Sequence, residues 1–79
     1  MDEFEEALFK AYFRLEGKLA PQPERGVTYV TIDDQEYAVL TNINGILAVF
    51  KLYPEGKIRF RRVRDPELID KIAEELGYL

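Results

Sequence analysis

The middle of the chain, residues 27–64, contains four short runs in which hydrophobic and polar residues alternate. Successive side chains of a β-strand point to opposite faces, so each run predicts a strand with one apolar face. The runs are separated by residues that favour turns, namely Asp34-Gln35, Asn44-Gly45 and Pro54-Glu55-Gly56. We therefore predict a four-stranded antiparallel meander of order 1-2-3-4, with strands at about 27–33, 36–43, 46–53 and 57–64.

The three turns also predict which residues lie opposite one another. Asn-Gly is the dipeptide favoured by a two-residue type I′ turn, because both central residues of that turn have positive φ. The expected cross-strand pairs are Ile32/Tyr37, Val30/Val39, Ile43/Ile46, Thr41/Ala48, Val39/Phe50, Tyr37/Leu52, Leu52/Ile58, Phe50/Phe60 and Ala48/Arg62. This register predicts one core face, made of Val30, Ile32, Tyr37, Val39, Ile43, Ile46, Phe50, Leu52, Ile58 and Phe60.

A helix is predicted before the meander in the sequence, at residues 2–16, and another after it, at residues 65–76. Both segments place apolar residues at the three- and four-residue spacing of an amphipathic helix. The stripes consist of Phe4, Ala7, Leu8, Ala11, Tyr12 and Leu15 in the first helix and of Leu68, Ile69, Ile72, Ala73 and Leu76 in the second. Asp65 suits the N-cap of the second helix, and Gly77 suits its C-terminal end. Residues 18–26 form an extended connector, so residues 1–79 are expected to be a single α+β domain of order α-β-β-β-β-α.

The composition excludes several kinds of chemistry. The 79 residues include no Cys, no His and no Ser, so disulfides, thiolate ligands and the usual nucleophiles and neutral-pH base are absent. The acidic residues Asp33, Asp34 and Glu36 lack the alternating pattern and the distal Glu of a calcium loop. We predict a protein that is not an enzyme and that uses neither a metal nor a cofactor.

Hydropathy bears on where the protein acts. No apolar run approaches the roughly 18 residues of a membrane-spanning helix, and no basic segment followed by an apolar one begins the chain. We therefore expect a cytoplasmic protein without membrane contact, and the prokaryotic cytoplasm is the expected setting.

Charge is unevenly distributed, although the net charge is −4. Residues 51–64 contain six bases and one acid, whereas residues 65–79 contain five acids and one base. The predicted register places a basic group with one aromatic residue on the second face of the sheet: Lys51, Tyr53, Lys57, Arg59 and Arg61. An apolar group is predicted toward the other end of that face: Val27, Tyr29, Leu40, Leu47, Val49 and Val63.

Three arrangements account for this second face. One helix can lie on each face of the sheet, so that the apolar group forms a second small core. Both helices can share the main face, so that the apolar group is exposed and contacts a partner protein or a second copy. Alternatively, the basic residues and Tyr53 bind single-stranded nucleic acid, with phosphates held by cations and a base stacked on the ring. Arg62 is predicted on the core side, paired with a helix carboxylate or anchoring a ligand.

The functional prediction is an accessory or regulatory subunit that acts by protein–protein contact, plausible as a homodimer. The predicted contact surface consists of Tyr29, Leu40, Leu47, Val49 and Val63, with a basic rim that includes Arg59 and Arg61. The alternative is single-stranded nucleic-acid binding through the third and fourth strands, at Lys51, Tyr53, Lys57, Arg59 and Arg61. A net charge of −4 opposes this alternative, because a dedicated nucleic-acid binder is usually basic. A small-molecule site between the first helix and the sheet is a third option.

Overall fold

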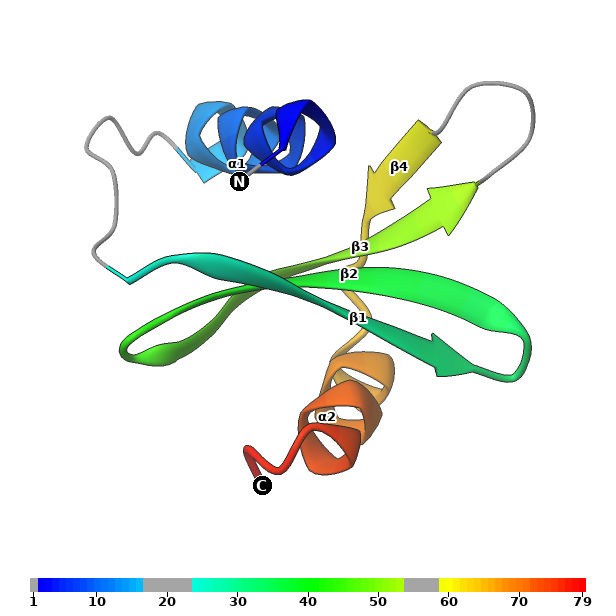
Figure 1. The fold of residues 1–79 in the computed structure, drawn as a ribbon. Helices are drawn as coiled ribbons and strands as arrows, with labels where there is room; N and C mark the ends of the chain where they lie inside the picture. The colour runs from blue at the N-terminus through cyan, green and yellow to red at the C-terminus, as the bar shows by residue number, and fades with distance from the viewer. Residues whose placement is uncertain (1, 17–23, 54–58) are drawn as a thin grey trace.

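The computed structural model describes residues 2–16, 24–53 and 59–79 and confirms the predicted order of elements. The six elements are α1 (Glu3–Glu16), β1 (Gly26–Ile32), β2 (Gln35–Asn42), β3 (Gly45–Tyr53), β4 (Arg59–Arg62) and α2 (Pro66–Glu75). The strands form one antiparallel sheet of order β1-β2-β3-β4 (Figure 1). Most of the predicted connector, the Pro54-Glu55-Gly56 turn, Lys57 and Ile58 lie outside the described residues.

The two helices cover opposite faces of the sheet, so the fold has three layers (Figure 1). On the face of α1, Leu8, Phe9 and Tyr12 are buried together with residues of β2 and β3. On the face of α2, Ile72 is buried against another set of strand residues, with Leu68 and Ile69 packed around it. Of the three arrangements that the sequence allows, the structure has one helix on each face.

Next to its turn, the β2–β3 hairpin pairs with a register that differs from the prediction by two residues, because the turn comes one residue earlier. Asn42 lies opposite Gly45, so the two turn residues are Ile43 and Asn44. The Asn42 side chain accepts a hydrogen bond from the Asn44 amide at 2.8 Å, and Gly45 takes a φ of +117° immediately after the turn. A side chain that binds the backbone two residues later stabilises a turn locally. This interaction places the turn one residue earlier than the Asn-Gly pair alone predicts.

Beyond Leu40, an extra residue in β3 reduces the difference from the predicted register to one residue, and this separates the predicted core face into two. Val39 lies opposite Val49 and Ala38 opposite Phe50, whereas the sequence predicted Val39 opposite Phe50. A shift of one residue moves side chains to the other face of a strand. Two clusters therefore replace the predicted single core. The cluster under α1 contains Ala38, Leu40, Ala48, Phe50, Leu52 and Phe60, and the cluster under α2 contains Val30, Ile32, Tyr37, Val39, Ile46 and Val49.

The predicted core is wrong most clearly at Ile43, because 66% of the surface of this residue is exposed in the turn.

The pairing of β3 with β2 is irregular near this turn. Leu40 lies opposite Ala48, but Thr41 lies opposite Ile46, so Leu47 is an extra residue in β3. Such a β-bulge interrupts the alternation of faces. As a result, the neighbours Leu47 and Ala48 both pack in the cluster under α1.

The registers of the two outer hairpins differ from the prediction by two residues, which preserves the faces. Val30 lies opposite Tyr37, and Leu52 lies opposite Phe60. The first turn consists of Asp33 and Asp34, whose φ values are 51° and 65°. Asp tolerates this left-handed conformation better than most residues do. The turn therefore comes one residue earlier than the predicted Asp34-Gln35.

The ends of α2 follow the predicted capping residues. Asp65 accepts a hydrogen bond from the Glu67 amide at 3.1 Å, and Pro66 is the first helical residue. At the other end, Gly77 has a φ of +85°, and the Tyr78 amide donates to the Ala73 carbonyl at 2.8 Å. This is the hydrogen bond of a glycine-terminated helix end. It directs the Tyr78 side chain back toward the sheet.

Candidate functional site

The structure brings four of the predicted basic-site residues together on one face. Lys51 of β3 lies opposite Arg61 of β4, and Tyr53 lies opposite Arg59. Directly opposed residues of antiparallel strands have their Cβ atoms about 4.5–5.5 Å apart and point to the same side. Lys51 is also opposite Tyr37, which packs under α2. We call the group Lys51, Tyr53, Arg59 and Arg61 the basic face.

The charges of the basic face are not neutralised within the described part of the chain. Arg59 and Arg61 are exposed, while Lys51 and Tyr53 are half-buried. None of its three cations forms an ion pair with another described residue. Lys51 instead lies with its Nζ atom 5.2 Å from the centre of the Tyr53 ring. Like charges directly opposite one another destabilise a sheet, so the Lys51–Arg61 pair is a site where a bound anion would be stabilising.

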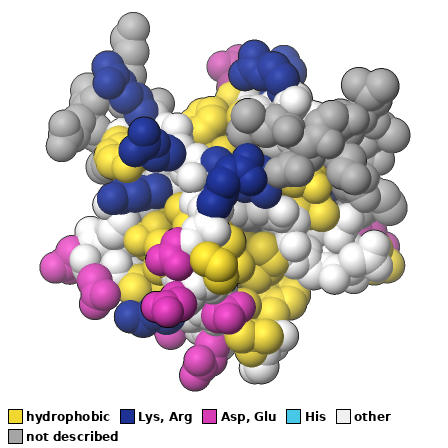
Figure 2. Space-filling view, turned by 180° about the vertical axis from the view of Figure 1, so that it is seen from behind, with side chains coloured by type: hydrophobic (Ala, Val, Ile, Leu, Met, Phe, Trp, Pro, Cys, Tyr) yellow, Lys and Arg dark blue, Asp and Glu magenta, His cyan; other side chains and the backbone are white. Residues whose placement is uncertain are grey.

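The shape and surroundings of the basic face suit an anionic ligand. Tyr53, Arg59, Phe60 and Arg61 line a shallow hollow with a volume of about 420 Å³. In the view of Figure 2, Lys and Arg side chains gather mainly in the upper half of the molecule, and Asp and Glu mainly in the lower half, where α2 lies. The molecule therefore combines a net negative charge with a local concentration of positive charge.

The predicted apolar contact surface is not a surface in the structure. Leu40 is 0% exposed and packs under α1, together with the half-buried Leu47. Val49 and Val63 lie on the opposite face, under α2. The prediction failed for two physical reasons: the register shift of one residue, and the helix that covers each face. Tyr29 is the one member with substantial exposure, at 42%.

Two residues connect the start of the sheet to α1: Tyr29, which belongs to β1, and Arg25, which directly precedes β1. The Tyr29 hydroxyl donates to Glu5 at 3.1 Å, and Arg25 forms an ion pair with Glu6 at 3.3 Å. The Arg25 guanidinium also lies 5.1 Å from the centre of the Phe9 ring. Burial, the hydrogen bond to Glu5 and nearby carboxylates together raise the pKa of Tyr29 from 10.0 to about 12. These contacts orient α1 on the sheet, and they give Tyr29 a structural role.

This raised pKa predicts a change of stability at alkaline pH. Because folding holds the proton of Tyr29 more tightly, its contribution is complete below pH 10 and declines as the pH rises from 10 toward 12. We expect the difference in free energy of unfolding between the parent and Tyr29→Phe to shrink over this interval. Urea unfolding of both proteins at a series of pH values measures the difference. A difference that stays constant through this interval would contradict the assignment.

Arg62 lies on the core side, as predicted, and is opposite Phe50. Its guanidinium carbon is 5.6 Å from the centre of the Tyr12 ring and 6.0 Å from that of the Phe50 ring. Both rings belong to the cluster under α1. Cations are attracted to the faces of aromatic rings, and the attraction is stronger where water is excluded. Arg62 thus helps to attach β4 to α1, and its predicted pairing with a carboxylate stays a prediction.

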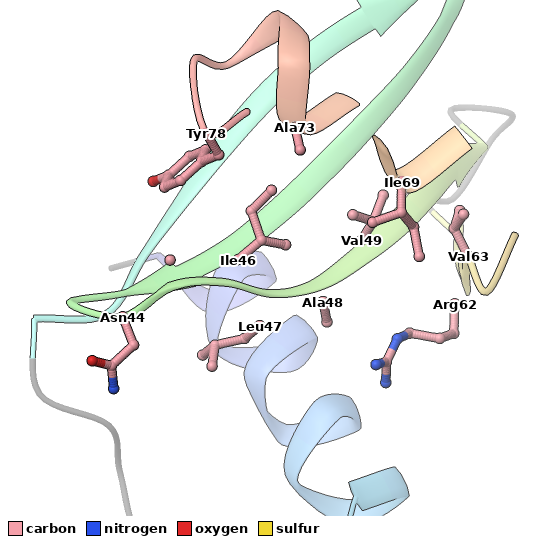
Figure 3. Close-up of a pocket in the computed structure, with 11 residues that line it drawn as sticks. Asn44, Ile46, Leu47, Ala48, Val49, Arg62, Val63, Ile69, Ala73 and Tyr78 are labelled. Carbon is pink, nitrogen blue, oxygen red and sulfur yellow. The ribbon is translucent and has the colours of Figure 1, made fainter. Parts of the chain in front are cut away.

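A second cleft, which the sequence did not predict, runs along β3 (Figure 3). Its volume is about 340 Å³, and it lies between α2 and the end of β4. The lining residues include Asn44, Ile46, Leu47, Val63, Ile69 and Tyr78. Two features of the sequence relate to this cleft. Gly77 ends α2 and lets Tyr78 return to the sheet, and Pro66 starts α2 soon after β4.

Neither a metal centre nor a membrane-spanning helix is found among the described residues. Within residues 2–16, 24–53 and 59–79, no three acidic, His or Cys side chains are grouped so that they could hold a metal ion. Neither described helix has the length and hydropathy to cross a membrane.

Comparison with protein-family models, with curated proteins and with solved structures finds no match to this chain. The candidate sites are therefore the basic face and the cleft along β3.

Proposed function

We propose that this protein is a non-enzymatic accessory or regulatory domain that binds an acidic segment of a partner protein through its basic face. The observation that carries the proposal is the pair of cross-strand contacts Lys51–Arg61 and Tyr53–Arg59. These contacts hold three cations and one aromatic ring on one face of two adjacent strands. Arg and Tyr are favoured at protein interfaces because they combine hydrogen bonding with a large contact area.

The charge distribution favours an acidic protein segment as the ligand. Charge complementarity speeds the encounter of two proteins and selects the partner. A long polyanion such as nucleic acid would in addition meet the acidic residues of α1 and α2, in a molecule whose net charge is −4. A short acidic segment can contact the basic face alone. The ligand proposed here is therefore a peptide segment that carries several Asp or Glu residues.

Single-stranded nucleic acid is the second candidate for the same face. The observation in its favour is that Tyr53 lies opposite Arg59 and beside Lys51 on one side of the sheet. An aromatic side chain among cations is the arrangement on which single-stranded bases stack while the phosphates contact the cations. This candidate predicts binding that weakens steeply with salt and that shows little preference for base sequence.

The test compares two probes, a poly-Glu peptide and oligo(dT), each titrated into the protein at increasing salt. We expect Arg59→Glu combined with Arg61→Glu to weaken binding of poly-Glu by about tenfold or more, because a favourable charge pair becomes repulsive at two positions. The matched control is Lys10→Glu combined with Arg14→Glu, which makes the same change of net charge on the exposed surface of α1. This control should bind nearly as well as the parent.

Each outcome bears on the proposal. Binding of poly-Glu that the basic-face variant loses and the control retains would support it. Tighter binding of oligo(dT) than of poly-Glu, with the same dependence on Arg59 and Arg61, would replace it with the nucleic-acid function. If neither probe binds at low salt, or if both double variants weaken binding equally, the proposal is wrong.

A further inference from the structure

The outer edge of β3 is only partly covered by β4. β3 spans Gly45–Tyr53, but β4 pairs with residues 50–53 alone. One further hydrogen bond, from the Val63 amide to the Val49 carbonyl at 2.8 Å, continues this pairing before the chain turns toward α2. In the described chain, no strand pairs with the outer edge of residues 45–48. An unpaired strand edge presents backbone donors and acceptors to which another strand can add.

This open edge lies in the cleft along β3. Figure 3 shows Ile69, Ala73 and Tyr78 on one side of the β3 ribbon and Leu47, Ala48 and Arg62 on the other. Arg62 is the single charged residue among the described residues that line the cleft, whereas a third of the whole chain is charged. The cleft is therefore a predominantly uncharged groove with a strand edge along it.

Exposed apolar side chains occur near the same end of the molecule. Four large hydrophobic residues of the described chain are exposed, and one of them, Tyr29, donates a hydrogen bond to Glu5. The others are Ile43 (66% exposed), Tyr78 (50%) and Leu79 (74%). Ile43 belongs to the turn that precedes β3, and the Tyr78 ring is 3.8 Å from where a Cβ on Gly45 would lie. Apolar surface thus adjoins the open edge.

The open edge carries one feature that commonly protects a strand edge, the β-bulge at Leu47, but it lacks two others, charged residues and proline. Residues 38–50 contain neither. The basic residues that do protect an edge, Arg59 and Arg61, are in β4 and lie beyond the open part of β3. The uncharged edge is therefore a surface that strand pairing would stabilise.

We infer that residues 45–48 of β3 pair with the same residues of a second copy of this chain, in antiparallel orientation about a twofold axis. A strand edge is complementary to itself in this orientation, and twofold dimers use the same patch on both subunits. The described residues that line the cleft include no acidic side chain, so two chains of net charge −4 can meet there without acidic side chains in contact. A second copy also supplies the same exposed apolar side chains.

The geometry of such a dimer has two consequences. Antiparallel pairing places the Asn44 end of one cleft beside the Val63 end of the other. A twofold axis perpendicular to the sheet keeps both α2 helices, and both basic faces, on one side of a continuous sheet. This dimer uses residues that are not in the basic face. It is therefore independent of the proposed binding of an acidic segment.

The test is sedimentation equilibrium of the full chain up to a concentration of about 1 mM, which detects dimers with a Kd near that value or tighter. We expect a dimer whose Kd rises by about tenfold or more in Ile43→Lys, because this substitution puts a cation beside the Arg62 end of the other copy's cleft. Tyr29→Lys is the control, since it introduces the same charge at an exposed tyrosine of β1. It should leave the Kd nearly unchanged.

Amide hydrogen exchange of the parent provides a second readout that needs no variant. Pairing of the edges predicts that protection at residues 45–48 increases with protein concentration, whereas protection in β1 does not. A monomer at every concentration would overturn the inference. So would a dimer in which Ile43→Lys has no effect and residues 45–48 gain no protection. A monomer whose residues 45–48 become protected only when an extended peptide is added would assign the edge to a different protein.

Discussion

Leu40→Glu should unfold the protein, whereas Ile43→Glu should leave it folded. Leu40 is fully buried under α1, and Ile43 is exposed in the β2–β3 turn. Removing a buried Leu side chain costs about 2–5 kcal/mol, and an unpaired carboxylate in its place adds a desolvation cost. A domain of this size has a total stability of roughly 5 kcal/mol, at the low end of the usual range.

This pair of substitutions also distinguishes the observed register from the one predicted by the turn sequence. The predicted register places Ile43 in the core and Leu40 on the second face, so it predicts greater damage from Ile43→Glu. Circular dichroism and urea unfolding of the two variants measure the difference. A folded Leu40→Glu protein, or an Ile43→Glu protein less stable than Leu40→Glu, would contradict the structure.

Substitutions of Leu8 and Ile72 should destabilise the protein independently of one another. Both side chains are buried, but Leu8 packs under α1 and Ile72 under α2, on opposite faces of the sheet. We expect a loss of about 2–5 kcal/mol for Leu8→Ala and of about 0.5–1.5 kcal/mol for Ile72→Val. Because the two residues belong to separate clusters, the effects should add to within about 0.5 kcal/mol in the double variant.

Urea unfolding of the parent, both single variants and the double variant gives the coupling energy directly. A matched comparison is Leu8→Ala combined with Leu52→Ala, because these residues share the cluster under α1. That pair should show a measurable coupling. A coupling between Leu8 and Ile72 as large as that between Leu8 and Leu52 would indicate that the two helices share one core, contrary to the observed layers.

Several features could be predicted because they depend on residues close together in the sequence. The α2 caps, Asp65 and Gly77, use side chains and backbone groups a few residues apart. Four of the five residues predicted for the basic group also share a face, although the β3–β4 pairing differs by two residues; the fifth, Lys57, lies outside the described residues. A shift of two leaves every side chain on its own face. Lys51, Tyr53, Arg59 and Arg61 therefore stay together in either register.

The predicted apolar contact surface shows why a shift of one residue matters more. The position of the β2–β3 turn depends on Asn42, whose side chain binds the Asn44 amide, and not on the Asn44-Gly45 pair alone. Moving the turn by one residue changes the pairing by two and preserves the faces, and the extra residue in β3, Leu47, then makes the difference one residue, which changes the faces. Both features act through the pairing of two strands, so the hydrophobic pattern of one strand does not reveal them.

The cleft along β3 was not predicted because its parts come from distant segments. β4 ends at Arg62, two residues before the predicted end of the strand, and its pairing with β3 is shifted by two residues; together these leave residues 45–48 without a partner strand in the described chain. Tyr78 then returns to the other end of the same edge. Neither event is visible in the sequence of β3 itself.

The sequence by itself determined the number, type and order of the helices and strands, since hydrophobic periodicity and capping residues act over a few positions. It also determined that Lys51, Tyr53, Arg59 and Arg61 share a face. Only the tertiary structure decided that each helix covers its own face, that Leu40 and Val49 are buried on opposite sides, and that β3 has an open edge. These outcomes depend on a register accurate to one residue, because one residue is the difference between the two faces of a sheet.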